Sequence, residues 1–360
     1  MVAPLATVFV AVATAVLGVV YAMPASAAAG DTHWFILNDA GSAGPWDVYQ
    51  QIGHPDGSFN GRVRISAQTG RVSGIIPNHG VSAVRVGGRM HLFVTTVVDG
   101  CSICTDPGLL LYSMQNTDGT WPAWKSILMQ PEGGMNVVAT NVAGQLHVVV
   151  VAPPQENGDT RILHSVKQAN GQWLPFGDLT AYAGNPGDIS YQLALAGMPN
   201  GELHVLVTGR SEKILHTVRS ADGSWSKWAN ILGHTGRAWA KDNPAYGPNE
   251  LVAAAVGADL HLLFENNGVI YHTIRYPAGN WLGWGNMSRV TGLNRYDLSE
   301  WSATGYSNGT LVVGGVHSGA NDLRRTMRHS DAEFGSWDPW TSTAVPTSAR
   351  AIGGVFLAGE

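Results

Sequence analysis

The sequence has little charge, no basic excess and no helical periodicity. Only 13% of its 360 residues are charged, and the formal net charge is −5. A nucleic-acid partner would need a basic face, so the composition argues against one. No run of like charge indicates a solvated tail or a patch for anionic membranes. Apolar spacing near 3.6 residues is missing after residue 30, which argues against a mainly helical body.

Cysteine is equally scarce, because the chain has only Cys101 and Cys104. A zinc site would need two further ligands at metal spacing, and none lies nearby. A thioredoxin-like redox pair would need a βαβ context, which is missing. In an exported protein we expect the two cysteines to form a small disulfide within one repeat. We expect no metal and no cofactor.

One long apolar run is present, over residues 5–22, and small residues follow it at 24–30. This pattern predicts a signal peptide over 1–28 and a single mature domain over 29–360. No Lys or Arg precedes the run, which could nearly span a bilayer, so an uncleaved anchor is the alternative. We expect a secreted, extracellular protein with no stable membrane insertion after signal cleavage.

The abundant feature is a repeat marked by tryptophan. A tryptophan followed three residues later by another aromatic ring recurs every 52 to 56 residues. The five segments are TWPAW (120–124), QWLPF (172–176), SWSKW (224–228), NWLGW (280–284) and SWDPW (336–340), and a fainter copy is PWDVY (45–49). Self-similarity at a fixed period of this size is the signature of a repeat architecture.

Each repeat contains four strand-like pieces, for example SYQLALA (190–196), ELHVLV (202–207), ILHTVR (214–219) and the aromatic segment. The third and fourth pieces are joined by turns such as Asp222-Gly223, which predict a type I′ hairpin with positive φ at both central residues. Four short antiparallel strands repeated around an axis predict an all-β propeller. A β-sandwich would not repeat at a fixed period, and β-helix coils are shorter.

Six aromatic segments predict six four-stranded blades, and a degenerate seventh unit within 50–80 is the alternative. Residues 32–49 resemble only the second half of a repeat, whereas 351–360 resemble a first strand. We therefore expect the C-terminal strand to join the N-terminal blade and close the ring, which removes an open edge. No second strand is recognisable for this composite blade, so we expect it to have three strands.

The paired aromatic residues are expected to pack the blades together. On a strand, residues i and i+3 point to opposite faces. Trp225 should then contact one neighbouring blade and Trp228 the other. Each ring can bury about 150–250 Å².

The combination of NGELHVLV (200–207) with ILHTVRSADGSWSKW (214–228) resembles the bacterial propeller lectins related to tectonins and to fucose-binding lectins. The resemblance is closest over 189–228 and is weak before residue 80. It implies a β-propeller that binds carbohydrate. A complete sugar-binding set cannot be matched residue by residue, so the resemblance assigns no site.

The candidate glycan-binding residues follow from what a sugar needs, which is an exposed aromatic face with fixed polar groups beside it. The second aromatic of each pair could supply the face, and the basic residue ending each third strand could supply the polar group. These candidates are Trp124, Trp228, Trp284, Trp340, Lys167, Arg219 and Arg275. The alternative is structural, with the tryptophans packed between blades and the basic groups stacked on them as cation–π pairs.

Histidines also recur with the repeat, on the second strands (His91, His147, His204, His261) and on the third strands (His164, His216, His272). We expect each to make a hydrogen bond within its blade, because buried polar groups need partners. A ring of histidines that lines the channel and holds a metal is the alternative.

Together these features predict a secreted, non-catalytic, lectin-like propeller that binds glycans multivalently in grooves between blades. One alternative is an exported hydrolase or lyase with acids in the central funnel, for which Asp242, Glu250, Glu265 and Glu300 are candidates. The long segment 232–249 is the best place for such a site. The other alternative is a protein-binding scaffold.

Overall fold

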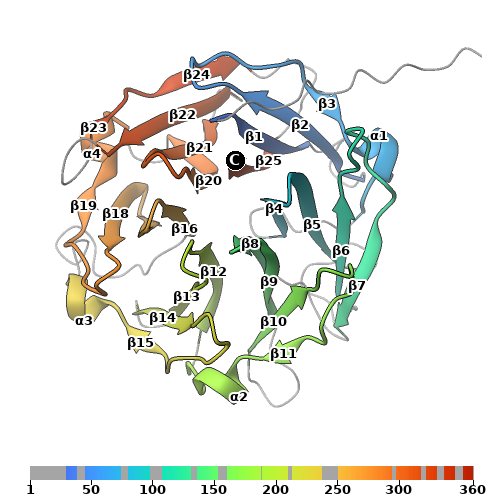
Figure 1. Ribbon diagram of the computed structural model, residues 1–360. Helices are drawn as coiled ribbons and strands as arrows, with labels where there is room; N and C mark the ends of the chain where they lie inside the picture. Colours follow the sequence, from blue (N-terminus) through green and yellow to red (C-terminus); the bar gives the residue numbers. More distant parts are fainter. Residues whose placement is uncertain are drawn as a thin grey trace, which may run out of the picture.

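The computed structural model shows sheets arranged as a ring of blades around an axis (Figure 1). The structure describes residues 30–38, 45–73, 80–97, 108–130, 136–152, 160–187, 189–209, 213–236, 250–293, 297–317, 322–330, 336–344 and 352–359. These residues form six sheets and confirm the predicted all-β propeller. Cys101 and Cys104 lie outside them, so their disulfide stays a prediction. Among the described helices, none has the length and apolar character needed to cross a membrane.

Blades 2 to 5 each contain four antiparallel strands in chain order. Blade 2 has β4 (Val81–Val86), β5 (Arg89–Val97), β6 (Gly108–Met114) and β7 (Lys125–Gln130). Blade 3 has β8 (Asn136–Val142), β9 (Gln145–Ala152), β10 (Arg161–Lys167) and β11 (Gly177–Asp178). Blade 4 has β12 (Ile189–Gly197), β13 (Leu203–Gly209), β14 (Lys213–Arg219) and β15 (Ala229–Asn230). Blade 5 has β16 (Glu250–Val256), β17 (Asp259–Asn266), β18 (Val269–Arg275) and β19 (Gly285–Asn286).

The two remaining blades contain the ends of the described chain. Blade 6 has β20 (Leu298–Gly305), β21 (Leu311–His317), β22 (Asp322–His329), β23 (Ser336–Trp337) and β24 (Thr341–Ala344), the last paired with β22. Blade 1 has the order β25 (Ile352–Gly359), β1 (Thr32–Asn38), β2 (Asp47–Gly53) and β3 (Val63–Arg64). The predicted ring closure by the C-terminal strand is therefore confirmed.

The expected three-stranded blade 1 and the alternative of a seventh unit are both wrong. The blade has four strands, because residues 32–38 are its second strand and β25 is its first. The described part of 50–80 completes this same blade, so it holds no seventh unit. PWDVY (45–49) leads into the third strand, whereas HPDGSF (54–59) fills the position of the turn and first tryptophan, with Phe59 bridged to Gly53.

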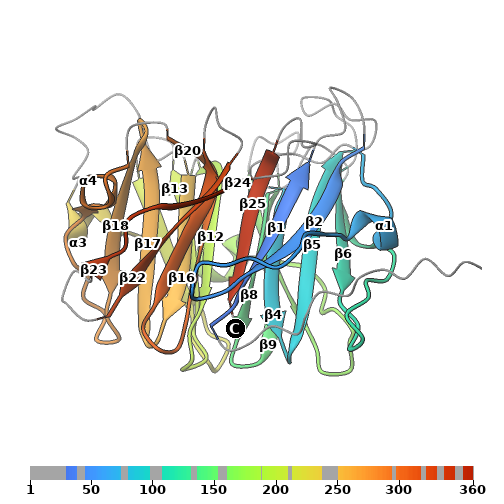
Figure 2. The same cartoon turned by 90° about the horizontal axis from the view of Figure 1, so that it is seen from above.

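The first strands of neighbouring blades contact one another around the axis, and the fourth strands lie at the rim (Figure 1). Viewed from the side, the strands run roughly along the axis and the short helices lie at the outer edge (Figure 2). These helices follow the fourth strands of blades 1, 3, 4 and 5. They are α1 (Ser66–Thr69), α2 (Thr180–Ala183), α3 (Leu232–Thr235) and α4 (Met287–Thr291).

The turn between the third and fourth strands differs from the expected type. In blade 4, Gly223 N donates to Ser220 O, and Ser220 N donates to Ser224 O. Only the glycine has positive φ, at 92°, because Asp222 is not among the non-glycine residues with positive φ. This is a type I turn closed by a glycine bulge. Asp222 instead accepts hydrogen bonds from the backbone and hydroxyl of Ser224.

Each junction between two blades has its own apolar cluster, so the core is divided into six parts. The junction of blades 4 and 5, for example, buries Leu206, Leu262 and Phe264 completely. Burial of apolar surface stabilises by about 25 cal/mol per Å², so these interfaces hold the ring together.

Candidate ligand-binding groove between blades

The paired aromatic residues lie at the blade junctions, but both members of a pair face the same neighbour. Trp281 packs edge-on against His216 of the preceding blade, with centroids 5.7 Å apart. Trp284 Nε1 donates to Thr235 Oγ1 of that same blade at 2.8 Å. Likewise, Trp225 and Trp228 both pack into the cluster between blades 3 and 4. The expectation that each pair contacts two different neighbours is therefore wrong.

The physical reason is a break in the strand. Trp225 bridges Arg219 at a single position, and residues 226–228 leave the strand before β15 begins at Ala229. The two-residue alternation of side chains does not extend across such a break. After this break, the second ring packs against the same cluster as the first.

The four candidate tryptophans of the pairs are half-buried against the preceding blade. Trp124 Nε1 donates to the backbone carbonyl of Gly70, just after α1, and Trp284 Nε1 donates to the side-chain hydroxyl of Thr235 in α3. Among the described residues, Nε1 of Trp228 and Nε1 of Trp340 have no hydrogen-bond partner. These contacts give all four rings a packing role, and their part in ligand binding remains a prediction.

The histidines form hydrogen-bonded pairs within the blades, as expected. The Nδ1 atom of the second-strand histidine lies 2.9 to 3.1 Å from Nε2 of the third-strand histidine in blades 3, 4 and 5. His91 pairs with the Tyr112 hydroxyl in blade 2, at 2.8 Å. The pairs lie between the second and third strands, and none of these residues lines the axial cavity. The alternative of a metal-holding ring in the channel is wrong.

Each histidine pair is covered by the next blade, which brings a tryptophan and a basic residue to it. Burial lowers the pKa of His147 to about 4, and the charge of Arg219 adds to this effect. Burial also lowers the pKa of His164 to about 3, with contributions from His147 and Arg219. His204 and His216 relate in the same way to Arg275. The pairs are therefore neutral near pH 7, and the basic residue of the next blade lies near enough for its charge to lower their pKa values further.

The three candidate basic residues have different surroundings. Lys167 Nζ contacts Met114 Sδ at 3.6 Å and lies 5.4 Å from the ring centroid of Tyr112, so its cation–π partner is a tyrosine of the preceding blade. The guanidinium of Arg219 lies beside Gly223, where an added Cβ would be 3.1 Å from Nη2. Arg275 lies over Gly279 in the same way. Neither arginine stacks on an aromatic ring within the described part of the chain.

A groove of about 460 Å³ opens between blades 3 and 4 beside Arg219. Its lining residues are Gln145, Val166, Gln168, Ala169, Asn170, Leu174 and Arg219. Leu174 is 41% exposed, and Gln145 is also exposed. The groove thus combines a guanidinium and side-chain amides with a small apolar surface. Of the seven candidate residues, it contains only Arg219, and its apolar wall is a leucine in place of the expected tryptophan.

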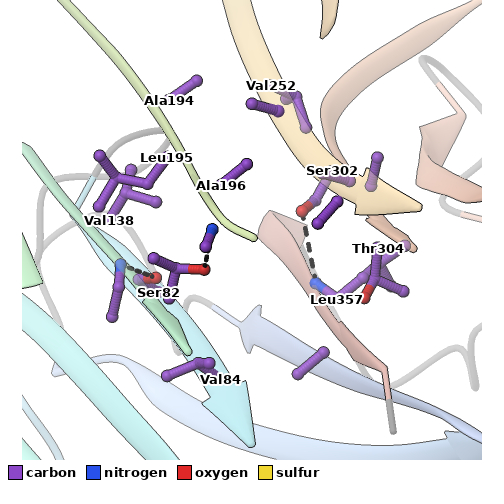
Figure 3. A pocket seen from close by; sticks show the side chains of 18 of the residues that line it. Ser82, Val84, Val138, Ala194, Leu195, Ala196, Val252, Ser302, Thr304 and Leu357 are labelled. Carbon is purple, nitrogen blue, oxygen red and sulfur yellow. Dashed lines mark hydrogen bonds between the residues drawn. The ribbon is translucent and has the colours of Figure 1, made fainter. Parts of the chain in front are cut away.

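A cavity of about 510 Å³ lies on the axis and is lined by the six first strands. Small apolar side chains such as Val84, Ala194 and Val252 line it (Figure 3). Its hydroxyl groups tie the blades together, since Ala139 N donates to Ser82 Oγ at 2.9 Å and Gly359 N to Thr304 Oγ1 at 2.8 Å. The lining also contains polar side chains, among them Asn136, Gln192 and the candidate acid Glu250.

The candidate acids are only partly described. Asp242 and the side chain of Glu300 lie outside the described residues, as does most of 232–249. Glu250 is the direct cross-strand partner of Glu265 in the β16–β17 ladder. The carboxylate of Glu265 accepts a hydrogen bond from Gly268 N, which stabilises the following turn. Among described residues, no group of three or more His, Cys, Asp or Glu could hold a metal.

The fold is shared with propeller lectins. The BP39L lectin from Burkholderia pseudomallei matches with a TM-score of 0.55 at 16% identity, over 88% of this chain and 81% of that one. AofleA from Arthrobotrys oligospora gives 0.52 at 10% identity, over 87% and 82%. The fucose-specific lectin from Aleuria aurantia gives 0.50 at 14% identity, over 85% and 92%. No protein-family model and no curated protein matches the sequence.

Identities this low show the fold and leave the ligand open, because one fold supports many functions. The sequence interpretation correctly predicted this class of architecture. It missed Gln145, Asn170 and Leu174 as groove residues. Their signal was weak, because each is an ordinary member of its repeat and the groove forms only where blades 3 and 4 meet.

Proposed function

We propose that this protein is a secreted, non-catalytic carbohydrate-binding propeller that recognises glycans in grooves between its blades. The observation that carries the proposal is the groove beside Arg219, where a guanidinium, exposed amides and Leu174 meet. A sugar ring offers hydroxyl groups to such donors and acceptors and C–H groups to an apolar side chain. The same fold in several lectins, one of them fucose-specific, makes glycans the ligand class to test first.

Repetition supports multivalent binding. Lys167 and Arg275 end the third strands of blades 3 and 5 as Arg219 ends that of blade 4. Weak sites on one rigid ring can act together on a branched or surface-bound glycan, which raises the overall affinity without any new contact. Trp228 and Trp284 lie at the same junctions as Arg219 and Arg275, and Trp124 and Trp340 lie at two further junctions. Each could contribute a ring edge to a larger ligand.

The experiment is a glycan-array screen of the mature chain together with Arg219→Ala and Arg275→Ala. We expect the wild type to bind a set of glycans and Arg219→Ala to lose most of this binding. Arg275→Ala removes the equivalent group of blade 5 and should weaken binding to multivalent glycans less. Thermal melts of the variants check that folding is intact. If the wild type binds no glycan, the proposal is wrong. If both variants bind as the wild type does, the groove is not the site.

The tryptophans need a separate test because they also pack the blades. Trp228→Phe keeps an apolar ring in the cluster between blades 3 and 4 while it changes the ring edge available to a ligand. We expect a melting temperature close to that of wild type and weaker glycan binding. Binding unchanged in a stable Trp228→Phe variant would restrict this residue to packing.

A hydrolytic function has one observation in its favour, the cross-strand pairing of Glu250 with Glu265. Two nearby carboxylates are what glycoside hydrolysis requires. The hydrogen bond from Gly268 N to Glu265 argues for a structural role of the second acid. Incubation of wild type and Glu250→Gln with a glycan library would decide: turnover lost in Glu250→Gln would establish an enzyme, and no turnover would leave binding alone.

A further inference from the structure

The junctions between blades differ in charge at one repeated position. Two residues before the second-strand histidine, the sequence has Arg89 in blade 2, Gln145 in blade 3, Glu202 in blade 4 and Asp259 in blade 5. This position begins β5, β9 and β17 and immediately precedes β13. Glu202 Oε2 lies 3.4 Å from His204 Nε2, so this side chain faces the histidine pair of its own blade.

The next blade brings its basic residue to the same place. Burial lowers the pKa of His204 to about 4, the charge of Arg275 adds to this shift, and Glu202 opposes it. Burial raises the pKa of Asp259, and the nearby charge of Arg328 from the next blade opposes that shift. The junctions of blades 4 and 5 and of blades 5 and 6 therefore each combine an acid with a base.

The junction of blades 3 and 4 lacks this compensation. Its basic residue is Arg219, and the residue opposite is the neutral Gln145, which lines the same groove. Neither Arg219 nor Arg275 forms an ion pair with a described residue, so the two junctions differ in the residue at the repeated position, which is Glu202 in blade 4 and Gln145 in blade 3. Asp222, in the hairpin turn of blade 4, has its pKa lowered by hydrogen bonds from Ser224 and also by the charge of Arg219. Its carboxylate is solvent-exposed and does not line the groove.

The junction of blades 2 and 3 is also basic, but its cation, Lys167, already contacts side chains of blade 2. Lys167 lies against Met114 and the ring of Tyr112. Burial lowers its pKa, and the charges of Arg89 and Lys125 add to that shift. Arg219 is different because its guanidinium borders an open groove. A planar guanidinium can bind a carboxylate through two parallel hydrogen bonds, which an ammonium cannot do.

We propose that the groove between blades 3 and 4 selects acidic sugars, those that carry a carboxylate or a sulfate, with Arg219 as the residue that binds the anionic group. Gln145 and Asn170 would contact hydroxyl groups, and Leu174 would pack against the sugar ring. This inference rests on the proposed carbohydrate-binding function and adds the class of ligand. Because both partners carry charge near the surface, the affinity should fall as salt screens them.

The experiment compares methyl glycosides that differ only in charge, galacturonate against galactose and glucuronate against glucose, by calorimetry at low and high salt. We expect wild type to bind the acidic member at least about tenfold more tightly, a difference of about 1.4 kcal/mol. Arg219→Ala should lose this preference, and Arg219→Lys should keep part of it. High salt should reduce it.

Two matched variants test the role of compensation. Gln145→Glu gives this groove the acid that blade 4 has in Glu202, at an exposed position where folding should be unaffected. We expect it to remove most of the preference for acidic sugars. Asp222→Asn removes the exposed turn carboxylate and should leave the preference in place.

The possible failures are distinguishable. Equal binding of the acidic and neutral members, or a preference unchanged in Gln145→Glu, would overturn this inference and leave the carbohydrate-binding proposal standing. If wild type binds no sugar either here or on a glycan array, both proposals are wrong. Loss of the preference in Gln145→Glu, with neutral-sugar binding retained, would support both.

Discussion

Blades 4 and 5 meet differently from blades 6 and 1, although both junctions bury a large aromatic ring. Between blades 4 and 5, the centre is a neutral histidine pair, His204 with His216, whose nitrogen atoms are 2.9 Å apart. Trp281 covers the pair edge-on. The same arrangement recurs between blades 3 and 4, where Trp225 covers His164, and between blades 5 and 6, where Trp337 covers His272.

Between blades 6 and 1 the histidine pair is replaced by Val312 and Arg325. Arg325 Nη1 donates to His54 O of blade 1 at 2.8 Å, and its guanidinium lies 5.8 Å from the ring centroid of Phe59. Tyr306 donates from its hydroxyl to Asp31 O at 3.0 Å. The closing junction therefore depends on a charged side chain that reaches across to the backbone of the other blade.

The difference shows that the repeat encodes the internal junctions and not the closure. An internal junction uses residues present in almost every copy, so any two consecutive copies can form it. Closure must join the first blade to the last, and it does so with residues that depart from the repeat. The formation of a six-bladed ring thus depends on the residues of blades 6 and 1 that depart from the repeat.

The largest expected effect is on closure itself. β1 pairs with β25 along its whole length, and β25 also contacts β20 and β4 on either side. Deletion of residues 352–360 exposes the edge of β1, where Trp34 to Leu37 are fully buried. We expect the truncated chain to lose its cooperative thermal transition, measured by circular dichroism.

Rescue provides the control for this truncation. A synthetic peptide of residues 352–360, added in excess, should restore the transition by taking the place of β25. A truncated chain that melts like the full-length protein would show that closure depends on the side-chain contacts between blades 6 and 1 alone.

Much of this ring could be predicted from sequence. The tryptophan period gave the blades, and the strand-like residues 351–360 indicated the closure. Phe59 was missed because blade 1 has a phenylalanine where other copies have tryptophan, although HPDGSF (54–59) matches SADGSW (220–225) at three consecutive positions. That signal was present in the sequence.

Other features could not be predicted, for physical reasons. The placement of Trp228 depends on how the backbone leaves the strand after Trp225, and no local pattern marks that break. The groove needs Arg219 from one blade and Gln145 with Leu174 from another. Such a groove forms only where two repeats pack together, so the sequence of one repeat does not predict it.

Acid should distinguish the two kinds of junction. Burial holds the pKa values of His147, His164 and His272 at about 3 to 4, so these rings stay neutral in the folded protein while the unfolded chain takes up protons. Stability must then fall as the pH drops from about 6.5 to about 4, by about 1.4 kcal/mol for each unit of pKa difference. Denaturant unfolding at a series of pH values measures this loss.

His54 at the closing junction should respond in the opposite direction. Hydrogen bonds to Asn60 and Asp31 raise its pKa, so it stabilises the protein at low pH and loses that contribution as the pH rises through its folded-state pKa. His164→Gln, which copies the His33–Gln50 bond of blade 1, should reduce the acid sensitivity, whereas His54→Gln should not. An unchanged pH profile in His164→Gln would contradict this explanation.

A substitution at Gly314 tests the packing of the closing junction. Trp34 lies so close to β21 that a Cβ on Gly314 would be 2.3 Å from its Cη2 atom. Gly314→Ala should therefore destabilise the protein by about 1–3 kcal/mol, the usual range for overpacking. Gly233→Ala is the control, since nothing lies within 4 Å of the added atom. Equal denaturation midpoints for the two variants would mean that the junction can repack.

The smallest effect concerns one hydrogen bond at the internal junction. Trp284 Nε1 donates to Thr235 Oγ1 of α3 at 2.8 Å, which ties blade 5 to blade 4. Thr235→Val removes the acceptor with little change of shape and should cost about 0.5–1.5 kcal/mol. Thr291→Val, at the corresponding helix of blade 5, is the matched control, because Thr291 Oγ1 bonds to Met287 O and Trp340 Nε1 has no partner among the described residues. A larger loss in Thr235→Val than in Thr291→Val would show that this indole is fixed by its polar edge as well as by packing, and an equal loss would assign its position to packing alone.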